Sequence, residues 1–200
     1  MAAFCAWLAA HGSSCLEVSA VAFGIAGVWL SVRQSVWNWP VGLVNVSLYF
    51  VLFQRSGLYS DQGLQVVYFV LAVYGWYEWL YGGKNKTPLR VSSVPRRQWP
   101  VLLVVGTVLW AAMGFVTSRL PGAAVPYLDA ALVSTSLLAQ WMLTRKLIET
   151  WILWIAADLV YVGLFLSRGL YLTAVNYAVY LGLAVLGYHA WKRSRLLQPA

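Results

Sequence analysis

The second half of this chain repeats its first half at an offset of 112 residues. Without a gap, residues 29–79 align with residues 141–191 and give 16 identities in 51 positions. Because Leu, Val and Ala are common everywhere, the aligned Gly, Trp and Tyr residues carry most of the signal. These pairs are Trp29/Trp141, Trp39/Trp151, Tyr49/Tyr161, Gly57/Gly169, Tyr59/Tyr171, Tyr68/Tyr180, Gly75/Gly187 and Trp79/Trp191. Apolar repeats of this length are the building units of many solute transporters.

Composition places the repeat in a membrane. Hydrophobic residues make up 61% of the chain and charged residues 10%, and the mean hydropathy is +0.69. A soluble domain has about a quarter of its residues charged, so this chain could not cover a water-exposed surface. Strands of a membrane barrel alternate in polarity over about ten residues, whereas stretches such as residues 101–105 are continuously apolar. The sequence therefore predicts membrane-spanning helices.

Seven apolar stretches are long enough to span a bilayer. A helix needs about 20 residues to cross roughly 30 Å of hydrocarbon, and the expected spans are residues 15–33, 37–54, 62–82, 99–118, 127–144, 147–167 and 172–191. The repeat covers the first three and the last three spans, and the fourth has no counterpart. A single linking helix would give both three-helix units the same orientation. We expect an all-α integral membrane fold of two parallel repeats, 3+1+3.

These spans predict four segments along the chain. Residues 1–83 hold an N-terminal segment and the first three-helix bundle, and residues 84–125 hold a cytoplasmic linker and the linking helix. Residues 126–192 form the second bundle, and residues 193–200 form a basic C-terminal tail. Trp and Tyr are enriched where spans meet the interface. We expect Trp37, Trp39, Trp76, Tyr77 and Trp79 to include such interfacial residues.

The basic residues predict the orientation of the chain. With the N-terminus outside, eleven Lys and Arg residues fall on the cytoplasmic side and three (Arg55, Arg119 and Arg168) on the outer side. Short loops rich in Lys and Arg stay cytoplasmic, so we expect the N-terminus outside and the C-terminus in the cytoplasm. The net charge of +8 is then a topology signal, and we expect no nucleic-acid partner.

Cysteine, histidine and loop motifs give no sign of catalysis. The sequence allows Cys5 and Cys15 to form a disulfide outside the membrane, but two separate thiols are the favoured interpretation. His11 and His189 lie far apart at the edges of spans, and no Ser/His/Asp or metal-ligand grouping accompanies them. The phosphate-binding pattern GxxxxGKS/T is absent. We therefore expect no enzyme, no cofactor and no metal site.

Polar and aromatic side chains recur within the spans at helical spacing. Such residues are costly in hydrocarbon and usually face a bundle interior or a watery cavity. The candidate substrate-binding residues are Asn45, Gln65, Tyr68, Trp154, Asp158, Tyr161, Asn176 and Tyr180. The amides could instead simply bond a neighbouring helix. Asp158 favours function, because a mid-span carboxylate needs a cation, a proton or a hydrogen-bonded network.

The scaffold repeats but its polar residues do not. Tyr49 and Tyr68 align with Tyr161 and Tyr180, whereas Asn45 aligns with Ala157 and Gln65 with Tyr177. This pattern indicates one asymmetric ligand bound by both halves. Ring faces attract flat or cationic groups, so aromatic residues beside amides and a carboxylate favour a planar, positively charged, hydroxylated solute.

At these positions the chain resembles the PnuC family of vitamin transporters. The first-half resemblance lies in Trp39-Pro-Val-Gly-Leu-Val-Asn45, Gly57-Leu-Tyr-Ser-Asp61, Leu64-Gln65 and Tyr74-Gly-Trp-Tyr-Glu-Trp79. The second-half resemblance lies in Thr144-Arg-Lys146, Trp151, Trp154 and the segment from Gly169-Leu-Tyr171 to Gly187 and Trp191. It extends over residues 16–192, and residues 37–79 are its specific part.

The resemblance implies a bacterial inner-membrane protein built like two joined semi-SWEET units. The best-known substrate of the family is nicotinamide riboside, which moves by facilitated diffusion and is trapped by a cytoplasmic kinase; relatives are assigned to thiamine or riboflavin. The amide ligands of the family carry over onto Asn45 and Gln65, and its second-half Trp onto Trp154. The expected partners are a small vitamin and the lipid bilayer, and the sequence leaves a homo-oligomer open.

The chain departs from the family pattern at Asp158, where nicotinamide riboside carriers are expected to have Asn. Nicotinamide riboside and thiamine both carry a cationic ring, so Asp158 could serve either. We rank nicotinamide riboside first, thiamine second and riboflavin third. A non-transporting membrane subunit that binds a partner protein is the alternative from a different class.

Overall fold

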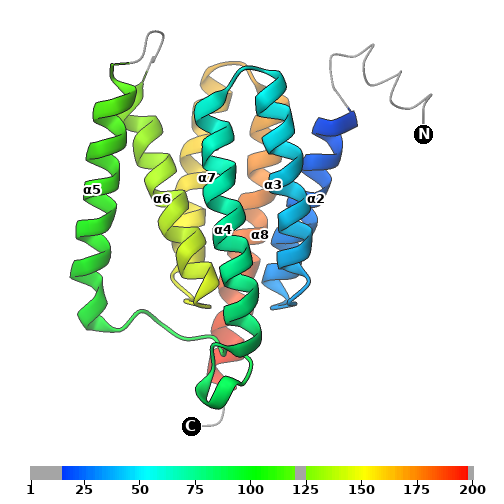
Figure 1. Ribbon diagram of the computed structural model, residues 1–200, viewed down its shortest axis with the longest axis vertical. Coiled ribbons are helices and arrows are strands. Elements are labelled where there is room, and N and C mark those ends of the chain that lie inside the picture. Colours follow the sequence, from blue (N-terminus) through cyan, green and yellow to red (C-terminus); the bar gives the residue numbers. More distant parts are fainter. Residues whose placement is uncertain (1–14, 120–124, 198–200) are drawn as a thin grey trace. The chain divides into compact units, whose positions relative to one another are not determined.

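The computed structural model describes residues 15–119 and 125–197. Within these residues the chain forms seven long α-helices and one isolated β-bridge, with no strand (Figure 1). The helices are α2 (Cys15–Val32), α3 (Asn38–Arg55), α4 (Tyr59–Tyr81), α5 (Trp99–Thr117), α6 (Pro126–Thr144), α7 (Thr150–Ser167) and α8 (Tyr171–Leu196). The all-α prediction is confirmed.

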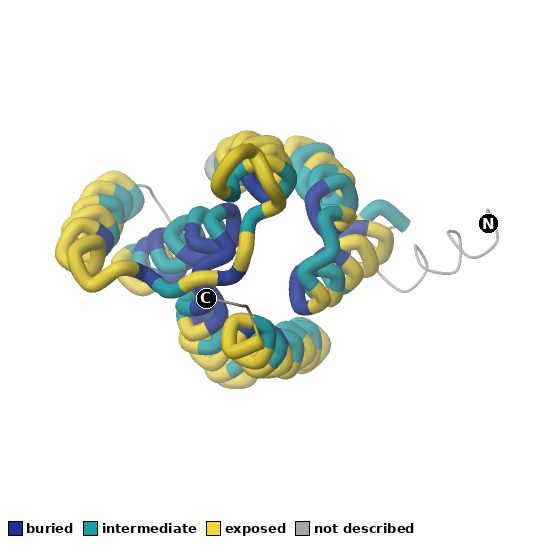
Figure 2. Tube along the Cα trace, turned by 90° about the horizontal axis from the view of Figure 1, so that it is seen from below, coloured by how far each residue is buried: buried dark blue, intermediate teal, exposed yellow. Residues whose placement is uncertain are grey.

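Length and composition of the helices are those of a multi-pass membrane protein. Four stretches are long and apolar enough to cross a bilayer: α2, residues 96–117 with α5, α7 and α8. The helices α3, α4 and α6 have 18, 23 and 19 residues, or about 27–35 Å at 1.5 Å per residue. Their length also suits a span, while polar side chains such as Asn45 and Gln65 lower their hydropathy. Figure 2 shows α5, the helix at the left, exposed along most of its length, as expected of a helix facing lipid.

The chain divides into two compact units, Met1–Pro88 and Leu89–Ala200. In the first unit α2 packs on α3 and α3 on α4. In the second unit α5 packs on α6, α6 on α7 and α7 on α8. The segment boundaries expected from the sequence and the parallel 3+1+3 arrangement stay predictions.

The repeat is visible in the backbone of each unit. Both α3 and α7 have 18 residues, and their ends differ by the same 112 positions. After each helix a glycine takes a left-handed conformation, with φ +71° at Gly57 and +72° at Gly169. The next N–H then reaches back five residues, from Leu58 to Phe53 and from Leu170 to Phe165, at 2.9 Å in both turns. This turn satisfies the last carbonyls of a helix and favours glycine.

Each unit is closed at one end by two buried tryptophans that meet edge to face. The ring centroids of Trp39 and Trp79 lie 5.3 Å apart at 86°, and those of Trp151 and Trp191 lie 5.3 Å apart at 89°. All four side chains are at most 2% exposed. That this group includes interfacial residues stays a prediction, but Trp39 and Trp79 are not among its exposed members, because both indoles pack inside their unit. Trp37, by contrast, is 71% exposed, as expected at an interface.

Glycines make room for these indoles. A Cβ on Gly75 would lie 2.3 Å from the ring of Trp39, and one on Gly187 would lie 2.6 Å from the ring of Trp151. No L-residue with a side chain fits there without moving the indole. The two glycines therefore repeat because the tryptophans do.

We predict that Gly187→Ala destabilises the protein by about 1–3 kcal/mol, the usual penalty for overpacking a close contact. The matched control is Gly182→Ala on the same helix, where nothing lies within 4 Å of the added methyl group and alanine is the better helix former. Thermal unfolding in detergent, followed by tryptophan fluorescence, measures both variants. Equal melting temperatures for the two would contradict the packing described for Trp151.

Residues 89–95 form a strap on the turn between α6 and α7. Ser92 N–H donates to the carbonyl of Lys146 at 3.0 Å, and Ile148 N–H donates to the carbonyl of Ser92 at 2.9 Å. Val91 and Val94 are buried. The sequence predicted only a linker here. The hydrogen bonds of the strap join segments more than 50 residues apart, and such bonds produce no periodic pattern in the sequence.

Side chains fasten the strap further. The polar contacts are Val94 N–H to Glu149 Oε2 at 3.0 Å, Lys146 Nζ to the carbonyl of Leu89 at 2.9 Å, and Arg195 Nη1 to the hydroxyl of Ser93. Burial lowers the pKa of Lys146 to about 8, because a desolvated ammonium group is disfavoured. The strap thus belongs structurally to the second unit.

Glu149→Ala should loosen the strap, because it leaves the half-buried Val94 N–H without an acceptor, at a cost of about 1–3 kcal/mol. Glu149→Gln keeps an acceptor oxygen and serves as the control. Hydrogen exchange of the peptide containing residues 89–95 should be faster in the alanine variant and unchanged in the glutamine variant. Unchanged exchange in both would show that this bond does not hold the strap.

Cys15, at the start of α2, is disulfide-bonded. The only other cysteine of the chain is Cys5, which lies outside the described residues. The prediction of two separate thiols is therefore wrong, since thiols without a metal pattern can equally well be partners in a bridge.

Candidate functional site

Asn45 joins two helices of the first unit. Its Nδ2 donates to the carbonyl of Ala20 on α2 at 2.6 Å, and Ala20 is fully buried. The sequence left open whether Asn45 bonds a neighbouring helix. Its Nδ2 group does so. The carbonyl oxygen of the Asn45 amide takes no part in that bond.

Gln65 lies half-buried on α4 and lines a groove of about 350 Å³ between α3 and α4. The other lining residues are Val46, Ser47, Phe50, Val51, Val66 and Phe69. The hydroxyl of Ser47 already donates to the carbonyl of Leu43 at 2.7 Å. Within residues 15–119 and 125–197, the amide of Gln65 makes no hydrogen bond. An unengaged amide in an apolar groove is the arrangement that orients small ligands.

An aromatic cluster lies where α7 meets α8 in the second unit. We use this name for Tyr161, Phe165, Tyr177 and Tyr180. The ring of Tyr177 stacks on Tyr161 at 4.5 Å and 29° and on Phe165 at 5.2 Å and 23°, and it meets Tyr180 edge-on at 6.1 Å. The cluster brings the predicted residues Tyr161 and Tyr180 together through Tyr177, which was missing from the predicted set.

The first unit carries half of this cluster. Tyr49 stacks on Phe53 at 5.6 Å and 23°, as Tyr161 stacks on Phe165 at 6.0 Å and 14°. The repeat partner of Tyr177 is Gln65, so an amide replaces the central ring. Tyr68, the partner of Tyr180, is half-buried one turn beyond Gln65. The repeat alignment could have identified Tyr177 as a site residue, because it pairs Tyr177 with Gln65, which was already a candidate.

Asp158 is the buried carboxylate of the second unit. It lies in the middle of α7 and is 5% exposed. It forms no ion pair or hydrogen bond with any residue that the structure describes. Trp154 precedes it by one turn and Tyr161 follows it by one turn, on the same side of the helix. A buried carboxylate is costly to ionise unless a cation or hydrogen bonds accompany it, so Asp158 is a candidate to bind a ligand or to hold a proton.

Trp154 and Asn176 are half-buried on α7 and α8. Neither enters a ring stack or side-chain hydrogen bond among the residues of known placement. The structure therefore groups Tyr161 and Tyr180 through Tyr177, sets Asp158 one turn from Tyr161, and leaves Trp154 and Asn176 as predictions.

Asn45→Ala and Gln65→Ala should differ in their effect on stability. Loss of the Asn45 bond to α2 should destabilise the first unit by about 0.6–1.7 kcal/mol, the range for hydrogen bonds between membrane helices. Gln65→Ala breaks no bond and should melt like the unaltered protein. Thermal unfolding in detergent tests both, and an equal loss in the two variants would argue against the different roles assigned here.

The chain is similar to known membrane transporters over most of its length. A family model described as nicotinamide mononucleotide transporter matches residues 14–193. The nicotinamide riboside transporter PnuC of Escherichia coli (strain K12) is 26% identical over 90% of this chain and 86% of the relative. The riboflavin/roseoflavin transporter RibM of Streptomyces davaonensis is 28% identical over 84% of this chain and 80% of the relative.

A solved structure is also similar. The crystal structure of the vitamin B3 transporter PnuC superposes with a TM-score of 0.70 at 26% identity, covering 89% of this chain and 80% of that one. Sequence and fold thus agree over nearly the whole chain.

Proposed function

The chain belongs to the nicotinamide mononucleotide transporter family, and we propose that it carries nicotinamide riboside across the bacterial inner membrane. The observation that supports this substrate most directly is the similarity to a nicotinamide riboside transporter over 90% of the chain. The helices of the chain are those of a multi-pass membrane protein, and the family is one of transporters rather than enzymes.

We propose a binding site made of residues from both repeats. It consists of Asn45, Gln65, Tyr68, Trp154, Asp158, Tyr161, Asn176 and Tyr180, with Tyr177 added. The support is chemical: an amide without a hydrogen bond at Gln65, a carboxylate without a charge partner at Asp158, and stacked rings beside it. A pyridinium riboside offers a carboxamide, hydroxyl groups and a cationic ring, which these side chains can bind.

Transport is proposed to be facilitated diffusion. The sequence contains no ATP-binding loop of the GxxxxGKS/T type, so uptake needs another source of direction. Phosphorylation of the riboside by a cytoplasmic kinase would supply it, because the carrier would no longer accept the product with its added phosphate group. The protein itself acts only as a carrier in this scheme.

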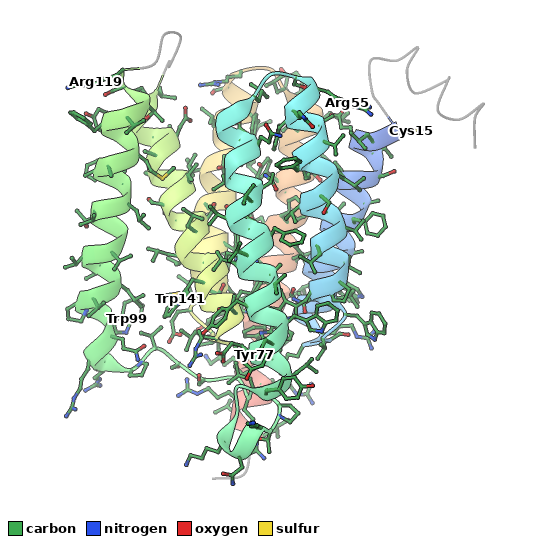
Figure 3. The ribbon with its side chains drawn as sticks, viewed as in Figure 1. Cys15, Arg55, Tyr77, Trp99, Arg119 and Trp141 are labelled. Carbon is green, nitrogen blue, oxygen red and sulfur yellow. The ribbon has the colours of Figure 1, made fainter. Side chains whose placement is uncertain are left out.

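The proposed orientation places the N-terminus outside and the C-terminus in the cytoplasm. Structural disulfides form in oxidising compartments outside the cytoplasm, and Cys15 at the start of α2 is disulfide-bonded. In the first unit Arg55 lies at the same end as Cys15, with Tyr77 towards the other end (Figure 3). In the second unit Arg119 lies opposite Trp99 and Trp141 (Figure 3). This orientation leaves the outer ends with few basic residues, as the positive-inside rule requires.

Riboflavin is the second candidate, because RibM is 28% identical over 84% of the chain. Thiamine, which the sequence ranked second, shares the cationic ring but has no relative among the similar proteins described above. Both belong in any test of the substrate.

We expect the detergent-purified protein to bind nicotinamide riboside and to reject its phosphorylated mononucleotide. Quenching of its twelve tryptophans measures binding, with thiamine and riboflavin as the other ligands. Selective binding of riboflavin or thiamine would keep the transporter but replace the substrate. Binding of none of the four would count against a vitamin carrier and favour a non-transporting subunit.

A further inference from the structure

We infer that the second unit binds anionic phospholipid headgroups through a cluster of basic side chains around the strap. The inference goes beyond the proposed function and does not depend on which solute the protein carries. It concerns the end of the unit where Trp99 and Trp141 lie (Figure 3).

The strap brings basic residues together from three parts of the sequence. Ser92 is hydrogen-bonded to the turn between α6 and α7, and Arg195, near the end of α8, donates to the hydroxyl of Ser93. Residues 96–98 then lead from the strap into α5. The positive-inside rule accounts for the number of basic residues at this end but not for their convergence. We call them the basic cluster: Arg90, Arg96, Arg97, Arg145, Lys146, Lys192, Arg193 and Arg195.

The second unit supplies this cluster with little negative charge. Its described residues contain three carboxylates, and two of them lie elsewhere: Asp129 in the first turn of α6 and Asp158 in the middle of α7. Glu149 lies beside the strap, and its Oε2 already accepts the hydrogen bond from Val94 N–H. The like charges of the cluster repel one another, so a bound anion would stabilise this end of the unit.

Four guanidinium groups of the cluster are exposed. They belong to Arg90, Arg96, Arg97 and Arg193. None of the four makes an ion pair, a side-chain hydrogen bond or a ring contact within residues 15–119 and 125–197. A guanidinium group keeps its charge at any physiological pH and binds phosphate through two parallel hydrogen bonds. These side chains are therefore suited to phosphate groups.

The position of the cluster favours lipid as the source of the phosphate. Helix α5 is exposed along most of its length, as expected of a helix facing lipid, and it begins directly after Arg96 and Arg97. Its first residue, Trp99, is 39% exposed, and tryptophans at the ends of spans lie at the level of the headgroups. The proposed orientation makes this the cytoplasmic end, where basic clusters beside a span attract anionic lipids.

The test compares two lipids that have the same acyl chains and differ in the charge of the headgroup. Native mass spectrometry of the detergent-purified protein measures binding of anionic phosphatidylglycerol and of zwitterionic phosphatidylethanolamine. The unaltered protein should bind phosphatidylglycerol at least fivefold more tightly. The double variant Arg96→Gln with Arg97→Gln should reduce this preference at least threefold, because glutamine keeps a long polar side chain but has no charge.

The double variant Arg119→Gln with Arg168→Gln is the matched control, because both arginines are exposed at the opposite end of the same unit. It should leave the preference unchanged. Circular dichroism checks the fold of each variant, and Arg193→Gln on α8 replaces the first double variant if that one does not fold. Equal binding of the two lipids by the unaltered protein overturns the inference. So does a preference that survives the loss of cluster arginines, or one that falls equally in the control.

Soluble anions distinguish lipid from other sources of phosphate. Inorganic phosphate and a short single-stranded DNA should each bind at least tenfold more weakly than phosphatidylglycerol. Binding of either as tightly as the lipid would overturn the inference and would indicate a site for a soluble phosphate or for a nucleic acid. Failure of the proposed function leaves these outcomes unaffected, because no vitamin takes part in the experiment.

Discussion

Close approach of helices in hydrocarbon is the constraint on which both units depend. Lipid tails solvate apolar side chains as well as a neighbouring helix does, so membrane helices associate through shape and dispersion contacts. Gly75 and Gly187 provide that shape by leaving room for the indoles of Trp39 and Trp151. Each indole then meets a second tryptophan edge-on, which fixes the separation of two helices at one end. The candidate binding residues further along the same helices take their positions from this contact.

The helices could be predicted because bilayer thickness sets their length. The expected span 37–54 differs from α3 by one residue at each end, and the repeat in sequence reappears as equal turns and equal tryptophan pairs. The burial of Trp39 and Trp79 could not be predicted, because tryptophan is also common at membrane interfaces. Gly75, which makes room for Trp39, lies far from it in the sequence. The strap of residues 89–95 escaped for a similar reason: its hydrogen bonds join segments that no periodicity connects.

The candidate site also has residues that could be predicted from the sequence and features that could not. Asp158 stood out from the sequence because a mid-span carboxylate is rare in any apolar run. The bond of Asn45 depends on a backbone carbonyl of α2, which residue identity does not reveal. Tyr177 was missed because Asn176 and Tyr177 are adjacent on the surface of α8. The sequence alone does not show which of the two side chains packs against α7. Two repeats with one fold thus differ in chemistry at a few positions.

Because of the strap, the contacts of the two units can be completed at different times during synthesis. The helix contacts described for the first unit join residues 15–86, so this unit can be complete while later helices are still being made. The second unit cannot, because Ser93 bonds Arg195, which follows it by 102 residues. Contacts between distant segments form late, so residues 89–95 cannot dock before the turn after α6 has been made, and the bond to Arg195 waits for α8. The first unit can therefore fold before the second unit is complete.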